Sequence, residues 1–298
     1  MSETTHMERE LRSQPEAWRS AAQLAAGAPL PRAGRRVAVV GCGTSWFMAQ
    51  AYAALRESAG LGVTDAFAAS EALLGAERNY EQVLAITRSG TTTEVLRLLE
   101  AVRGRIPTVT VIGDPDTPAT AVSDETVALP FADERSVVQT RFATSALALL
   151  RAHLGEDVEE AARDARETLT AEVRQEWVEA EQFTFLGTGW TVGLAHEAAL
   201  KMREASQSWT ESYPAMEYRH GPISIAAPGR VTWLFGPSPE GLEQQVAGTG
   251  GAFVHHAGRD PLAELVLVQR VALERARARG LDPDAPRALT RSVMLDAP

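Results

Sequence analysis

Apolar and polar positions alternate in blocks along this chain of 298 residues. Short β-branched runs end at or near glycine, as buried parallel strands do, and longer stretches with helical spacing separate them. This succession predicts a parallel sheet with right-handed crossovers. In the first half the predicted strands are 36–41, 83–87, 108–113 and 125–129, and the predicted helices are 8–26, 46–59, 92–103 and 138–153.

A second block of the same kind follows a long charged stretch, which predicts a connecting helix. Its predicted strands are 183–187, 231–235 and 252–255, and its predicted helices are 191–208 and 261–279. Both blocks open with a strand, a Gly-x-Gly turn (41–43 and 187–189) and a helix, which is a weak internal repeat. We therefore predict an α/β protein with a helical segment over 1–30, a first domain over 31–155, a connecting helix over 156–180, and a second domain with a C-terminal tail over 181–298.

Charge and cysteine content narrow the function classes. The formal net charge of −10 argues against a nucleic-acid or anionic-membrane partner. It leaves a small phosphorylated ligand open, because backbone amides at a helix start bind phosphate. The single cysteine, Cys42, excludes an internal disulfide and a cysteine-cluster metal site. We expect no metal and no cofactor. Without a long apolar run or a signal-peptide pattern, a cytoplasmic location is expected.

Two predicted strands end in runs rich in glycine and hydroxyl groups, 41–45 and 87–93. Ligands of open parallel sheets bind beyond the carboxyl ends of the strands, where glycine admits an anion and hydroxyls donate to it. Ordinary helix capping is the alternative for either run alone. Two consecutive runs favour phosphate binding, whereas a dinucleotide fits less well because Trp46 stands at the third glycine position. The candidate phosphate ligands are Gly43, Thr44, Ser45, Thr87, Arg88, Ser89, Thr91 and Thr92.

Acid–base candidates gather in the second half. Lys201 is the only lysine beside 28 arginines, and helical spacing places it one turn from Glu197 and from Glu204. An ammonium can lose its proton and add to a carbonyl, whereas a guanidinium stays charged. Chance survival of one lysine is the alternative. His220 precedes Gly-Pro, which predicts a turn, and histidine carries protons near neutral pH, although a single histidine is more often structural.

The ordered motifs resemble the sugar isomerase (SIS) family. They are Cys-Gly-Thr-Ser at 42–45, Ser-Gly-x-Thr at 89–92, Ala-Leu-Lys-x-Arg-Glu at 199–204, His-Gly-Pro at 220–222 and Pro-Arg-x-Leu-x-Arg-Ser-Val at 286–293. Over residues 8–298 the chain is similar to the isomerase half of glucosamine-6-phosphate synthase and to amino-sugar-phosphate deaminase/isomerases. The resemblance implies two tandem SIS domains, each a flavodoxin-like three-layer sandwich, and a homodimer with its site near the interface.

The resemblance also implies residue roles. Glu204 would move a proton between C1 and C2 of the sugar, His220 would help to open the ring, and Lys201 would lie in the site. Lys201 or Arg203 would stabilise the enediolate-like intermediate. The phosphate would be bound by Thr44, Ser45, Ser89 and Thr92, and further candidate substrate contacts are Gln139, Thr140, Arg203 and Arg291.

Some positions depart from the family pattern. Thr87 and Arg88 replace a Ser-Gln pair, so that Arg88 either pairs with the phosphate or marks a different ligand. Arg291 stands where the synthase has a lysine that can form an imine, and arginine cannot do that chemistry. The segment between His220 and Arg291 is short, so we expect the second sheet to lack a strand. No cysteine lies near the start of the chain, so we expect no glutamine-derived ammonia here.

These observations favour an amino-sugar-6-phosphate deaminase/isomerase, with a plain aldose–ketose phosphate isomerase as a close variant. A non-catalytic sugar-phosphate sensor and a synthase half without its glutaminase domain stay open as alternatives.

Overall fold

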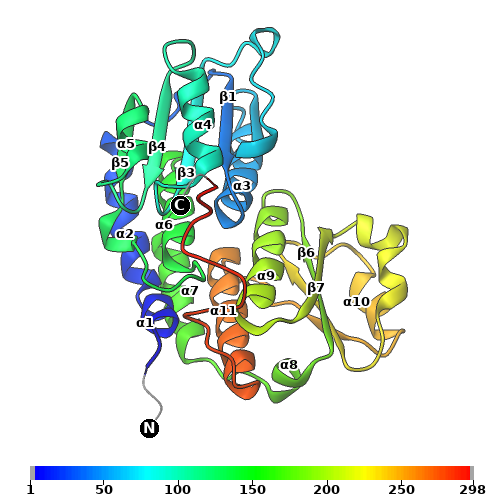
Figure 1. Ribbon diagram of the computed structural model, residues 1–298. Coiled ribbons are helices and arrows are strands. Elements are labelled where there is room, and N and C mark those ends of the chain that lie inside the picture. The colour runs from blue at the N-terminus through cyan, green and yellow to red at the C-terminus, as the bar shows by residue number, and fades with distance from the viewer. Residues whose placement is uncertain (1–3, 296–298) are drawn as a thin grey trace. The chain divides into compact units, whose positions relative to one another are not determined.

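The computed structural model describes residues 4–295 and shows an α/β protein whose sheets are parallel and flanked by helices (Figure 1). Packing divides these residues into two compact units. The first-sheet unit contains residues 16–135, 139–158 and 290–295, and the second-sheet unit contains residues 4–15, 136–138 and 159–289. Each unit holds one sheet, so the predicted fold class is confirmed at this level.

The first sheet has five strands in the order β2-β1-β3-β4-β5, and every neighbouring pair is parallel. Its middle strands β1 and β4 are buried at every position, which explains why neither contains a charged residue and why β-branched residues are frequent in both. The strands are β1 (Val37–Gly41), β2 (Thr64–Ala68), β3 (Gln82–Thr87), β4 (Thr108–Ile112) and β5 (Glu125–Ala128).

Helices cover the first sheet. Helix α4 packs its buried side chains, Val95 and Leu99 among them, against the sheet face that carries Ala38, Val40 and Ala85. Helix α3 packs against β1 and α6. The helices of this unit are α2 (Gln14–Leu24), α3 (Thr44–Ser58), α4 (Thr93–Val102), α5 (Pro118–Val122) and α6 (Arg141–His153), with short 3-10 turns η1 (Ala25–Gly27), η2 (Ala69–Glu71), η3 (Ala76–Arg78) and η4 (Pro130–Ala132).

The second sheet has four parallel strands in the order β7-β6-β8-β9, one fewer than the first, as expected. Helix α11 packs against α9 and α7. The strands are β6 (Gln182–Gly187), β7 (Trp209–Pro214), β8 (Arg230–Phe235) and β9 (Ala252–Val254). The helices are α1 (His6–Arg12), α7 (Glu159–Thr170), α8 (Gln175–Glu179), α9 (Thr191–Ser206), α10 (Leu242–Ala247) and α11 (Pro261–Ala278), with 3-10 turns η5 (Glu217–His220) and η6 (Pro222–Ile225).

Two sequence predictions about helices were wrong. The single helix predicted over 156–180 is two helices, α7 and α8, and Arg270 Nη1 donates to the carbonyls of Thr168 and Ala171 at the end of α7, at 2.6 and 2.5 Å. The helix predicted over 8–26 is divided between α1 and α2. Pro15 has no N–H to continue α1, and the Ser13 hydroxyl donates to the Glu10 carbonyl at 2.8 Å at the end of that helix.

Every predicted strand is present, but β2 and β7 were not predicted. Both lie at sheet edges, where one side of the strand has no neighbour. Each has a single buried residue, Thr64 in β2 and Thr210 in β7, and neither contains a run of β-branched apolar residues. Within residues 4–295, no helix is long and apolar enough to cross a bilayer.

Candidate functional site

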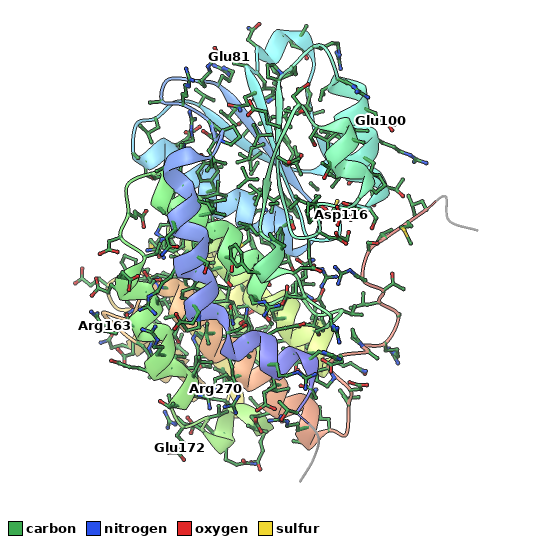
Figure 2. The ribbon with its side chains drawn as sticks, turned by 90° about the vertical axis from the view of Figure 1, so that its left-hand side faces the viewer. Glu81, Glu100, Asp116, Arg163, Glu172 and Arg270 are labelled. Atoms are coloured by element: carbon green, nitrogen blue, oxygen red, sulfur yellow. The ribbon has the colours of Figure 1, made fainter. Side chains whose placement is uncertain are left out.

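The two hydroxyl-rich runs follow the carboxyl ends of β1 and β3, on either side of the point where the strand order of the first sheet reverses. After β1 the chain turns to β2 on one side, whereas β3 lies on the other side of β1. Val40 of β1 pairs with Ala85 of β3, so the loops after both strands start next to each other. In Figure 2, Glu81, just before β3, lies at the amino ends of the strands, and Asp116, beyond β4, lies at their carboxyl ends. In open α/β sheets such a switch point is where ligands bind.

The loop after β1 is shaped by two glycines. A Cβ at Gly41 would lie 2.6 Å from the backbone carbon of Ser45, so only glycine lets α3 start this close to the strand. Gly43 is the N-cap of α3 with φ 52° and ψ −124°, a conformation that side chains disfavour. Thr44 and Ser45 begin the helix and are each 3 % exposed. No side chain caps this helix, so capping does not explain these hydroxyls.

The loop after β3 has the same character. Thr87, Arg88 and Ser89 are buried. Gly90 has φ +62°, and a Cβ there would collide with the Thr117 hydroxyl at 1.9 Å. Thr92 is the N-cap of α4, yet its side chain makes no capping hydrogen bond. Neither helix start has a side-chain cap. Two hydroxyls of this loop accept local backbone N–H groups, Thr87 Oγ1 from Gly90 and Ser89 Oγ from Thr91, each at 3.3 Å.

Cys42 lies between the two glycines of the first loop and is partly buried. Burial, with the negative charge of Glu94 as a second cause, raises the pKa of its thiol to about 11. The thiol is therefore protonated at neutral pH, and a nucleophilic role for it is not supported.

The guanidinium of Arg291 lies in the first-sheet unit, where Nη2 donates to both carboxylate oxygens of Asp133 at 2.7 and 2.8 Å. Sequence reasoning missed Asp133, although its place beyond β5, at the same edge of the sheet, was a usable signal. Gln139 has a buried Oε1 that meets no donor among the described residues. Thr140 is fully buried and its hydroxyl donates to Glu134 Oε1 at 2.8 Å, and its contact with a substrate stays a prediction.

The acid–base candidates on α9 belong to the second-sheet unit. Lys201 Nζ donates to Glu204 Oε2 and lies 3.6 Å from Glu197 Oε1. The side chain of Lys201 is fully buried, whereas that of Glu204 keeps 18 % of its surface exposed. Arg203 Nη1 donates to the Thr210 hydroxyl at 2.9 Å, and the charges of Glu204 and Glu197 also act on its guanidinium. Of the three, Glu204 is the one whose side chain reaches the surface, and Lys201 donates to its carboxylate.

His220 is exposed at the end of η5 and makes no hydrogen bond to another residue of the described range. The predicted turn is present, since Gly221 has φ 131° and the short 3-10 turn η6 follows. No group of His, Cys, Asp and Glu side chains among residues 4–295 is arranged to hold a metal ion.

Comparison with known proteins bears on this arrangement. The glutamine–fructose-6-phosphate aminotransferase (isomerizing) of Sulfurisphaera tokodaii is 26 % identical over 296 residues, which cover 88 % of this chain and 50 % of that protein. The chain spans about half, or less, of the length of the first such relatives. No family model matches the chain.

Two solved structures share the fold. The glucosamine-6-phosphate deaminase of Thermotoga maritima superposes with a TM-score of 0.81 and 23 % identity, covering 97 % of this chain and 99 % of that one. The resemblance to the sugar isomerase (SIS) family is confirmed. The tagatose-6-phosphate ketose/aldose isomerase of Escherichia coli gives a TM-score of 0.75 at 18 % identity, covering 96 % and 97 % of the two chains. The SIS fold is thus shared by neighbours named for different reactions on sugar phosphates.

Proposed function

We propose that this SIS protein binds a phosphorylated amino sugar and catalyses proton transfer between C1 and C2, with release of ammonia. The observation that carries the proposal is the pair of non-capping hydroxyl loops, 41–45 and 87–93, on either side of the first sheet's switch point. Such an edge recognises a phosphate through amides and hydroxyls even in an acidic protein. The phosphate is remote from the reacting carbons, so its binding energy holds the sugar in register.

The proposed chemistry needs one base and one cation. In the open-chain aldose, Glu204 takes the proton from C2 and returns it to C1, which converts the 2-amino aldehyde into a ketose imine. Water then adds to the C2=N bond and ammonia leaves, so atoms and electrons balance without a cofactor. Lys201, which donates to Glu204, positions the carboxylate and offsets the negative charge of the enediolate-like intermediate. His220 would serve ring opening.

The proposal includes the expected architecture of two tandem SIS domains and a homodimer. The two separate parallel sheets and the shared fold of the SIS neighbours support the first part. The boundaries 31–155 and 181–298 stay a prediction.

A non-catalytic sensor is the second candidate, and one observation favours it. The position of the synthase lysine is held by Arg291, whose guanidinium is bound to Asp133. A sensor needs the phosphate loops but no base.

Incubation with hexosamine 6-phosphates in deuterated water tests the proposal. We expect deuterium at C1 or C2 and free ammonia from at least one sugar. Glu204→Gln should abolish label incorporation while the phosphate-dependent rise in melting temperature persists. Glu243→Gln, an exposed carboxylate on α10, is the matched control and should retain exchange.

The outcomes separate the candidates. Ligand-induced stabilisation without label supports the sensor, label without ammonia supports the plain isomerase, and undiminished exchange in Glu204→Gln refutes the assigned base.

A further inference from the structure

The segment Thr290–Leu295 lies across the loop after β3, within the first-sheet unit. Figure 1 shows this red segment ending beside α4 and β3. Four hydrogen bonds join it to residues 88–93. Arg88 Nη2 donates to the Arg291 carbonyl at 2.6 Å, the hydroxyls of Thr91 and Ser292 are 2.8 Å apart, Thr93 N–H donates to the Val293 carbonyl at 3.1 Å, and Leu295 N–H donates to the Thr93 hydroxyl at 2.9 Å.

These contacts use the donors that a phosphate would need. Thr93 is the first residue of α4, so its N–H belongs to the anion-binding start of that helix. The Val293 carbonyl accepts from that N–H, as a phosphate oxygen would. Arg88 and Thr91, two candidate phosphate ligands, are engaged by the same segment. One N–H cannot donate at full strength to two acceptors, so the segment and a phosphate compete for the loop.

The segment is held by a charge pair rather than by apolar packing. Asp133 accepts both bonds from Arg291 Nη2, and Arg291 Nη1 donates to the Glu134 carbonyl. Val293, Met294 and Leu295 are 52, 53 and 60 % exposed, so little apolar surface is buried when the segment docks. Segments with few buried apolar contacts open at low free energy. Docking therefore depends mainly on polar contacts that an anion can replace.

We propose that Thr290–Leu295 is a self-inhibitory strap, latched by Arg291 and Asp133, that occupies the anion-binding loop after β3 and is displaced when a phosphorylated ligand binds. The inference rests on the proposed phosphate site and adds its regulation. It assigns Arg291 to the latch instead of to the substrate.

Binding of inorganic phosphate and of glucosamine 6-phosphate, measured by calorimetry, tests the strap. Because apparent affinity falls by the fraction of molecules in the competent state, a strap docked nine-tenths of the time weakens binding about tenfold. Asp133→Asn and deletion of residues 290–298 should therefore each bind phosphate several-fold more tightly than wild type. The charge exchange Asp133→Arg with Arg291→Asp should return affinity toward the wild-type value.

Hydrogen exchange gives a second readout that does not depend on how well the variants fold. Saturating phosphate should speed amide exchange in residues 290–295 of the wild-type protein. Slower exchange there, or equal or weaker phosphate binding in both latch variants, would show that the segment covers the bound ligand or forms part of its site. Either result would overturn the strap and leave the phosphate site intact. If neither ligand binds any variant, the proposed site itself fails, and the strap fails with it.

Discussion

The ammonium of Lys201 lies 3.6 Å from Oε1 of Glu197 on α9, and these two side chains are 0 and 1 % exposed. Lys201 also donates to Glu204, whose carboxylate reaches the surface. One buried cation thus serves two carboxylates on a single helical face. The i, i+3 and i, i+4 spacing that suggested this trio from sequence produces it.

Loss of the buried ammonium should be strongly destabilising. Lys201→Met would remove the buried ammonium beside the buried carboxylate of Glu197, and breaking such a pair costs about 3–5 kcal/mol. We expect a loss of that size in the free energy of unfolding, measured by denaturant titration. Arg163→Met is the matched control, since its pair with Glu160 is exposed on both sides and solvent screens such pairs, so we expect little change in its stability. Similar losses in the two variants would contradict a buried charge network.

Removal of one hydroxyl from the phosphate loops should affect binding more than folding. Ser45 is buried at the start of α3, and no side chain caps that helix. A hydrogen bond to a charged group contributes about 1.5–3 kcal/mol, so Ser45→Ala should weaken binding of a hexosamine 6-phosphate about 10- to 100-fold in calorimetry. Ser58→Ala, at the exposed far end of the same helix, should leave affinity unchanged. Unchanged affinity in Ser45→Ala would remove this residue from the site.

The glycine at the end of β1 should resist substitution. In Gly41→Ala the new methyl group would meet the backbone carbon of Ser45 at 2.6 Å, and overpacking of this kind costs about 1–3 kcal/mol. We expect a lower melting temperature together with weaker phosphate binding, because α3 must move. Gly27→Ala, whose added carbon meets nothing within 4 Å, is the control. A Gly41→Ala protein as stable as this control would show that the close approach of strand and helix is not required.

Stability should fall in mild acid through His196. Burial, and then the positive charge of Arg203, lowers the pKa of His196 from its ordinary value near 6.5. As the pH falls below that value, the unfolded chain takes up the proton before the folded one does, so the free energy of unfolding decreases. The contribution of His196 to stability is fully present above its ordinary pKa, and it is lost as the pH falls through the lowered pKa of the folded state.

His196→Gln removes this dependence. Unfolding titrations at pH 8 and pH 5 should show a larger loss of stability in the wild-type protein than in the variant. An equal loss in both would mean that other groups dominate the acid response.

Much of the architecture was predictable because its cause is local. Short runs rich in β-branched residues, such as 37–41 and 108–112, identify strands buried on both faces, and all seven predicted strands are present. The strands β2 and β7, with the sequences TDAFA and WTESYP, were missed because neither contains a run of β-branched apolar residues. The division of the connector into α7 and α8 depends on Arg270, about a hundred residues away along the chain, and no local pattern reveals it.

The candidate site divides in the same way. Glycine and hydroxyl runs at strand ends are local signals, so the two loops were found. The attachment of Arg291 to Asp133 joins residues 158 positions apart, and only the folded chain brings them together. For that reason Arg291 was predicted as a substrate contact, whereas its observed partner is a carboxylate of the protein.

The burial of Lys201 has a practical consequence for work on this protein. Every other basic side chain apart from the histidines is an arginine, so the surface of residues 4–295 offers no lysine amine to acylating dyes, amine cross-linkers or coupling resins. Labelling by such reagents should therefore be confined to the α-amino group while the fold is intact. Modification of Lys201 then becomes a direct report of unfolding.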